Sequence, residues 1–226
     1  MSRTLVYCGF LQAPGVSLPE TGVGAAAVQV MAAGELRLLW SEVEWPFPPE
    51  HMQRFAVEFH GVVHHILRQA AVVPFRLLSV FETTEAVAAF AGEHEGAFIA
   101  DLKRLKSVVQ MECVIYPAPS GAKEPVDPGS GAAYLREKAE MARVIGQQVS
   151  DVQTALGSLA RDIRVREGRN GTRVFALVER GRESEFRSMI EQAGKPAQLA
   201  RRVSGPWPAA EFLSEQVRTP QVAGAK

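Results

Sequence analysis

The chain has 226 residues, of which 46% are hydrophobic, and its 25 Lys and Arg residues equal its 25 Asp and Glu residues in number. That length accommodates one large domain or two small ones, and the apolar content is sufficient for a core. Nucleic-acid binding normally requires a basic excess that neutralises phosphates, and a polybasic membrane anchor requires the same. The balanced charge therefore argues against nucleic acid and membrane as partners.

The sequence also indicates where the protein is expected to reside. It contains no apolar stretch approaching the ~18 residues of a membrane span, and Met1 is not followed by the pattern of a signal peptide. Its two cysteines, Cys8 and Cys113, each lie in an apolar run. This placement is typical of buried thiols and not of a disulfide framework or a zinc site. We therefore expect a cytoplasmic protein.

The first half of the chain predicts a sheet interrupted by helices. Its expected elements are strands over 4–10, 24–31 and 35–43, a helix over 50–70, a strand over 72–81, helices over 84–92 and 93–106, and a strand over 107–116. Ala33-Gly34 suits a tight hairpin because Gly tolerates positive φ. The expected helix over 50–70 carries apolar residues at spacings of three and four, which indicates one buried face. The strand over 72–81 is apolar enough to lie at the centre of a sheet.

The second half follows a segment rich in Pro and Gly, which predicts a linker. Its expected elements are a long helix over 130–159, strands over 163–167 and 172–179, a helix over 182–193 and a strand over 197–204. Asn170-Gly171 between two of these strands is a strong hairpin signal. The polar residues after Phe212 predict a mobile tail.

Helices and strands do not alternate strictly, which favours the α+β class over a doubly wound α/β fold. We predict two domains, the C-terminal one ferredoxin-like with a long leading helix. The expected ranges are an N-terminal α+β domain over 1–117, a linker over 118–130, the ferredoxin-like domain over 131–213 and a flexible tail over 214–226. The strand over 107–116 is an alternative first strand for the second domain, which leaves this boundary open.

No motif predicts catalysis. Gly22-Val23-Gly24 matches a loose dinucleotide fingerprint but lacks the preceding strand and following helix that would bind a pyrophosphate. His60 and His64 lie four residues apart on the expected helix, a spacing that can present two imidazoles to a metal, although no third ligand is evident. We predict neither an enzyme nor a bound cofactor or metal. The alternative that stays open is a metal-dependent or other small-molecule enzyme that uses His60 and His64.

Three segments are unusual enough to be informative. Val73-Pro74-Phe75-Arg76-Leu77 places Arg76 inside an apolar run, and an unpaired buried charge is costly. Gly131-Ala132-Ala133-Tyr134-Leu135 opens the long helix, and Gly205-Pro206-Trp207-Pro208 ends the last strand.

In this order, the three segments resemble the gas vesicle protein GvpL/GvpF family. The run from Val72 to Phe81 resembles the family's Val-Leu-Pro-Leu-Arg-Phe-Gly-Thr-Val-Phe. The segment from Gly131 is similar to its Gly-Arg-Ala-Tyr-Leu, and Ser204-Gly205-Pro206-Trp207-Pro208 is similar to its Thr-Gly-Pro-Trp-Pro. The similarity extends over nearly the whole chain.

The resemblance implies an accessory or minor structural protein of gas vesicles. Members of the family are expected to bind the hydrophobic major shell protein and other gas vesicle accessory proteins during assembly, without enzymatic activity or a cofactor. The implied location is the gas vesicle in the cytoplasm. A divergent scaffold without a gas vesicle role is the remaining alternative.

A partner of an apolar shell protein needs exposed aromatic surface and sheet edges to receive it. Trp is over-represented at binding hot spots. The expected protein-binding residues are Trp40, Trp45, Phe47, Arg76 and Trp207.

Overall fold

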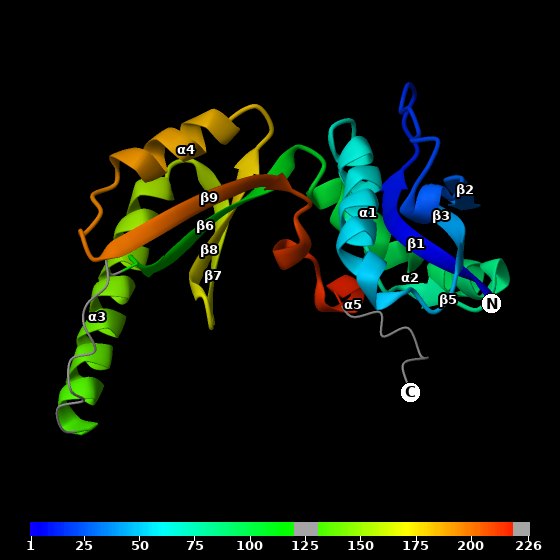
Figure 1. The fold of residues 1–226 in the computed structure, drawn as a ribbon. Coiled ribbons are helices and arrows are strands. Elements are labelled where there is room, and N and C mark those ends of the chain that lie inside the picture. The colour runs from blue at the N-terminus through cyan, green and yellow to red at the C-terminus, as the bar shows by residue number, and fades with distance from the viewer. Residues whose placement is uncertain (120–130, 219–226) are drawn as a thin grey trace. The chain divides into compact units, whose positions relative to one another are not determined.

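The computed structural model describes residues 1–119 and 131–218 (Figure 1). Contacts within the chain group it into two compact units, one formed by Met1–Val108 with Trp207–Lys226 and the other by Val109–Pro206. Each unit has one sheet with helices packed against it. Strands and helices do not alternate strictly in either unit, so the predicted α+β class is confirmed.

The first unit is organised around its first strand. Its elements are β1 (Ser2–Leu11), β2 (Gln29–Ala33), β3 (Leu36–Glu44), α1 (Met52–Leu67), β4 (Val73–Pro74), β5 (Val80–Phe81), α2 (Thr84–Arg104) and α5 (Glu215–Arg218). The strand order is β2-β3-β1-β4, and β5 also pairs with β1. Because β1 is central, its residues Leu5, Val6, Tyr7 and Cys8 are all completely buried.

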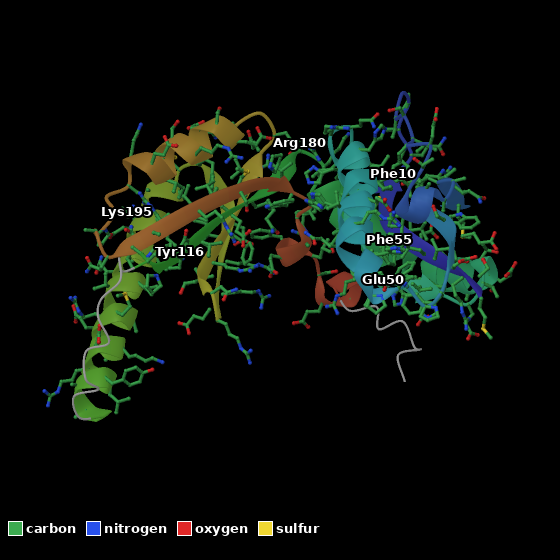
Figure 2. The ribbon with its side chains drawn as sticks, viewed as in Figure 1. Phe10, Glu50, Phe55, Tyr116, Arg180 and Lys195 are labelled. Atoms are coloured by element: carbon green, nitrogen blue, oxygen red, sulfur yellow. The ribbon has the colours of Figure 1, made fainter. Side chains whose placement is uncertain are left out.

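Two helices cover opposite faces of this sheet (Figure 1). On one face, the Tyr7 ring lies 5.2 Å from the ring of Phe59 on α1. On the other, Phe98 of α2 packs against Gly9 together with Leu38. The side chains of Phe10 on β1 and Phe55 on α1 (Figure 2) are 3% and 7% exposed. Both faces of the sheet are therefore apolar.

A buried chain of hydrogen bonds fastens the loop before β2 to the sheet. The Tyr7 hydroxyl donates to Ser41 Oγ over 3.0 Å and accepts from the Val23 N–H over 3.0 Å. Ser41 Oγ in turn donates to the Ala27 carbonyl over 2.8 Å. Burial raises the pKa of the Tyr7 hydroxyl, so it stays protonated and able to donate. The loop thus has a defined position on β1 and β3.

Three details of the first unit differ from the sequence prediction. The expected central strand over 72–81 is instead two short strands separated by a turn, closed by a hydrogen bond from the Ser79 N–H to the Arg76 carbonyl. The strand expected over 24–31 begins only at Gln29, because Val23–Ala25 form a single 3-10 turn. The two expected helices over 84–106 form one helix, α2.

The second unit has the ferredoxin-like arrangement. Its elements are β6 (Val108–Pro117), α3 (Gly131–Leu156), β7 (Ala160–Gly168), β8 (Gly171–Glu179), α4 (Glu183–Gln192) and β9 (Leu199–Trp207). The sheet order is β7-β8-β6-β9. Residues of β6 share one buried cluster with α3 and α4, including Cys113, Val152 and Phe186. This βαββαβ order confirms the predicted fold of this half.

The first strand of that arrangement is β6, the alternative that the sequence left open. Its contacts place Val109 onward in the second unit, whereas the predicted boundary lay at residue 117. The reason is pairing, since β6 lies between β8 and β9. Residues 120–130 of the predicted linker lie outside the described residues.

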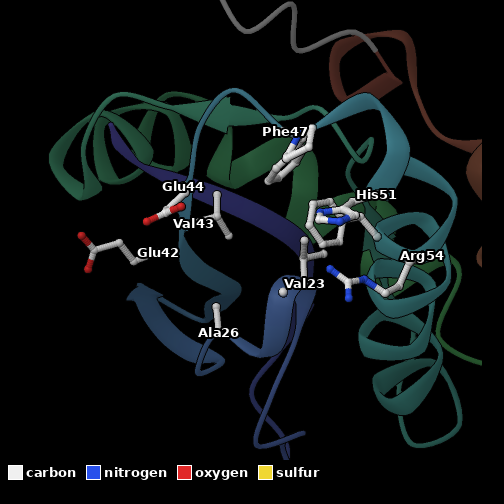
Figure 3. A pocket seen from close by; sticks show the side chains of 11 residues that line it. Val23, Ala26, Glu42, Val43, Glu44, Phe47, His51 and Arg54 are labelled. Carbon is white, nitrogen blue, oxygen red and sulfur yellow. The ribbon is translucent and has the colours of Figure 1, made fainter.

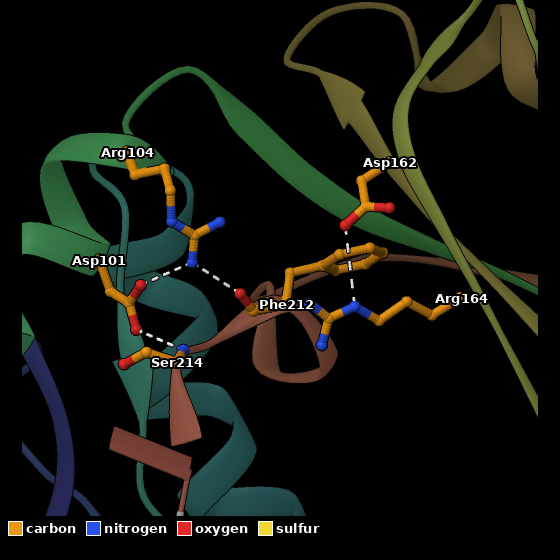
Figure 4. Close-up of polar contacts among 6 residues, drawn as sticks. All are labelled: Asp101, Arg104, Asp162, Arg164, Phe212 and Ser214. Atoms are coloured by element: carbon orange, nitrogen blue, oxygen red, sulfur yellow. Dashed lines mark hydrogen bonds and ion pairs between the residues drawn. The ribbon is translucent and has the colours of Figure 1, made fainter. Parts of the chain in front are cut away.

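After β9 the chain rejoins the first unit. Asp101 on α2 accepts hydrogen bonds from Arg104 over 2.5 Å and from the Ser214 N–H over 2.7 Å (Figure 4). Arg104 also donates to the Phe212 carbonyl over 2.6 Å. Val217 on α5 is only 2% exposed, which differs from the flexible tail expected over 214–226. Residues 219–226 of that tail lie outside the described residues.

Replacing Gly171 by Ala should destabilise the second unit. Gly171 has a φ of +114°, and a Cβ there would collide with the Ile115 carbonyl oxygen and lie 2.9 Å from Tyr116 Cβ. We expect a loss of about 1–3 kcal/mol in the free energy of unfolding, measured by denaturant titration. The control is Gly146→Ala on α3, where an added Cβ meets nothing within 4 Å and should add up to ~1 kcal/mol. Equal stability of the two variants would contradict the strain at Gly171.

Replacing Tyr7 by Phe should loosen the loop before β2. The Val23 N–H would lose its acceptor and Ser41 would lose a donor in a buried site. We expect a loss of about 1–3 kcal/mol in unfolding free energy and faster amide exchange at Val23. Tyr134→Phe is the control, since Tyr134 is 56% exposed and should change stability by less than ~0.5 kcal/mol. Unchanged exchange at Val23 would show that the hydroxyl does not hold the loop.

Candidate protein-binding surface

An open pocket of about 380 Å³ lies in the first unit between the loop before β2, the end of β3 and the start of α1. Val23, Val43 and Phe55 contribute apolar lining. Figure 3 shows Glu42 and Glu44 on the β3 side, and His51 and Arg54 on the α1 side. The pocket thus has an apolar centre between an acidic and a basic rim.

Phe47, His51 and Phe55 line this pocket, and Trp45, which does not line it, packs on Phe47. The Trp45 and Phe47 ring centroids are 5.1 Å apart, and those of Phe47 and Phe55 are 5.0 Å apart, both edge to face. The centroid of the His51 ring lies 5.6 Å from that of Phe55, also edge to face. Phe47 is 9% exposed, so it supports the pocket, while the half-buried Trp45 presents surface to solvent. Of the five predicted residues, these two come together.

The charged rim is held by contacts within the first unit. Arg54 lies 3.7 Å from Glu58 and 5.1 Å from the centre of the Phe55 ring. Glu58 accepts a hydrogen bond of 2.8 Å from the Gly24 N–H. These contacts connect α1 with the loop before β2 and keep the two walls of the pocket together.

Trp40 lies elsewhere, on the α2 face of β3. It lines a second hollow of about 360 Å³ with Arg3, Glu82 and Thr83. Glu42 lines both hollows, so the two are neighbours along β3. The other residues that line this second hollow are polar or charged, so Trp40 is its one large apolar side chain.

Arg76 lies in the turn between β4 and β5 with an exposed side chain. The sequence suggested a buried charge that would need a partner. The turn removes that requirement, because water solvates the guanidinium there. Leu78 in the same turn is 55% exposed. The turn therefore presents a cation beside an apolar side chain.

Trp207 packs on the two histidines considered as metal ligands. Its ring centroid lies 5.0 Å from that of His60 and 5.4 Å from that of His64, and the two imidazoles are 4.1 Å apart. Burial, then the charges of His60 and Arg68, lower the pKa of His64 to about 4. Within residues 1–119 and 131–218, no three His, Cys, Asp or Glu side chains are placed to hold a metal. The geometry favours an aromatic contact that anchors the returning chain.

The other candidate chemistry is accounted for by structural roles. The N–H groups of Val23 and Gly24, which a dinucleotide fingerprint would offer to phosphates, donate to Tyr7 and Glu58 instead. Burial raises the pKa of the Cys8 thiol to about 12 and that of Cys113 to about 11. Both thiols are therefore unreactive at neutral pH.

Sequence reasoning missed His51, Arg54 and Phe55 as pocket residues. The spacing of apolar residues predicts a buried face of α1, and Phe55 belongs to that face, but the spacing says nothing about a neighbouring hollow. The signal that the sequence offers is proximity along the chain, because Phe55 follows Phe47 closely at the start of α1.

Within the described part of the chain, no helix is long and apolar enough to cross a membrane. Residues 3–214 match the family model described as gas vesicle synthesis protein GvpL/GvpF. No curated protein matches the sequence.

Two solved structures are similar in fold. The crystal structure of GvpF from Anabaena sp. PCC7120 has a TM-score of 0.75 and 14% identity, covering 94% of this chain and 96% of that one. That of GvpF from Microcystis aeruginosa has a TM-score of 0.68 and 13% identity, covering 89% of this chain and 95% of that one. Because the family model matches nearly the whole chain, this protein belongs to the gas vesicle synthesis protein GvpL/GvpF family.

Proposed function

We propose that this protein is an accessory or minor structural protein of gas vesicles that acts by binding rather than catalysis. Its partners would be the hydrophobic major shell protein and other gas vesicle accessory proteins, and it would act at the gas vesicle in the cytoplasm. The observation that carries the proposal is the family match over residues 3–214.

The first unit supplies chemistry that suits such a partner. Specific interfaces combine an apolar centre with a polar rim, and aromatic side chains anchor them. The pocket has this composition, with Val23, Val43 and Phe55 between the charged residues of β3 and α1. Trp45 does not line the pocket, but it is half-buried and packs edge-on against the lining residue Phe47, so it would be the anchor beside the pocket.

The proposal is tested by co-expressing this protein with the short, apolar shell protein of the same organism and then using this protein as bait in a pull-down. We expect the wild-type chain to retain the shell protein or another gas vesicle protein. Trp45→Ala should weaken the interaction ~30-fold or more, because Trp hot spots contribute about 2 kcal/mol or more.

Val57→Ala is the control for that variant. Val57 is 69% exposed on α1 and does not line the pocket, so its truncation should leave binding unchanged. Thermal melting of each variant separates weakened binding from unfolding. A wild-type chain that retains no gas vesicle protein would contradict the function, whereas full binding by Trp45→Ala would contradict only the assignment of the pocket.

A further inference from the structure

The sheet of the first unit ends at an unprotected edge. β2 is the terminal strand of the order β2-β3-β1-β4. An edge strand has a row of backbone N–H and C=O groups that no neighbouring strand pairs with. The five residues of β2, Gln29–Ala33, carry no charge and no proline, and Val30 is 45% exposed. Such an edge is a template for another strand.

The other sheet edges of the described residues are protected. At the opposite end of the same sheet, β4 and β5 have two residues each, and β4 contains Pro74. In the second unit, the edge strand β9 contains Arg201 and Arg202. The other edge strand, β7, contains the charged residues Arg161, Asp162, Arg164, Arg166 and Glu167. Charged residues, proline and very short strands are the usual means of preventing strand addition. β2 contains no charged residue and no proline, and with five residues it is longer than β4 and β5.

The two faces of the edge determine which strand would fit. Val30 pairs with Leu39, and Met31 pairs with Leu38. Both leucines are completely buried, on opposite faces of the sheet. β2 is exposed or half-buried at all five residues, with Val30 and Ala32 on one face and Met31 and Ala33 on the other. An added strand would therefore lie beside apolar side chains of β2 on both faces.

We infer that β2 receives an extended, uncharged apolar segment of a partner protein as an additional antiparallel or parallel strand of the first unit's sheet. This inference rests on the proposed function, which requires a hydrophobic protein partner, and it assigns to that partner a second contact beside the pocket, whose loop wall continues into β2. Main-chain hydrogen bonds supply the affinity, and Val30 and Met31 select apolar side chains on the two faces.

A second copy of this chain is a weaker candidate for the occupant. β2 has five residues and so spans only about 17 Å. Pairing two such short strands buries far less than the ~1,200 Å² of a stable protein interface. Addition of an extended segment relies on main-chain hydrogen bonds and side-chain contacts rather than on a large interface, so the short, uncharged edge favours that occupant.

The test compares two valine-to-lysine variants in complexes with the co-expressed shell protein. Val30→Lys places a charge on the β2 edge, and Val165→Lys places the same charge on the already charged edge strand β7, where Val165 is 39% exposed. Both sites are solvent-exposed, so both variants should fold, which thermal melting verifies. We expect Val30→Lys to weaken binding at least ~10-fold and Val165→Lys to change it by less than about twofold.

Amide hydrogen exchange on the wild-type complex locates the contact independently. We expect those amides of residues 29–33 that face away from β3 to exchange at least ~10-fold more slowly in the complex than in the chain alone, because new main-chain hydrogen bonds protect them. Binding that leaves these amides and the Val30→Lys variant unaffected would overturn this inference while the proposed function stands. No binding by the wild-type chain would overturn both.

The oligomeric state of the protein without a partner provides a further test. Size-exclusion chromatography with light scattering reports its mass, and we expect the same mass for the wild type and Val30→Lys. A wild-type dimer that Val30→Lys converts to a monomer would assign the edge to a second copy and overturn the proposal of a partner strand.

Discussion

The hydrogen bonds around the Tyr7 hydroxyl are the constraint on which the surface of the first unit depends. Tyr7 and Ser41 are both completely buried, on the two central strands of the sheet. Through them the loop of residues 20–28 is bound at Val23 and Ala27. That loop forms one wall of the pocket and then continues directly into β2. A buried donor without an acceptor is costly, so the same bonds determine the pocket wall and the start of the edge strand.

How much of this was predictable depends on the range of the interactions involved. The face of α1 and the Asn170-Gly171 hairpin follow from local periodicity and turn chemistry, and both are present. The strand expected over 72–81 was wrong, because an apolar run does not reveal that Ser79 and Arg76 close a turn. The first strand of the ferredoxin-like unit was ambiguous from sequence for a related reason, since strand order is a tertiary property.

The candidate surface shows the same difference between local contacts, which the sequence predicts, and long-range contacts, which it does not. Trp45 and Phe47 are close in sequence, and their proximity followed from the chain itself. The packing of Trp207 on His60 joins residues far apart in the chain, and the spacing of His60 and His64, which left a metal-dependent enzyme open as an alternative, could not predict it. Arg76 was expected to need a partner because its strand was expected to be central. Its exposure follows from the turn, so the error about the side chain came from the error about the strand.

The distribution of charged residues on the edge strands connects the balanced charge of the chain with its proposed mode of action. A chain with zero formal net charge has no long-range repulsion to keep copies apart, so local charges must prevent unwanted strand pairing. The arginines of β7 and β9 provide this in the second unit. A charge on β2 would protect the first unit equally, but it would also exclude an apolar strand. The absence of charge there is therefore consistent with an edge kept open for a partner, at a length too short to hold two copies together.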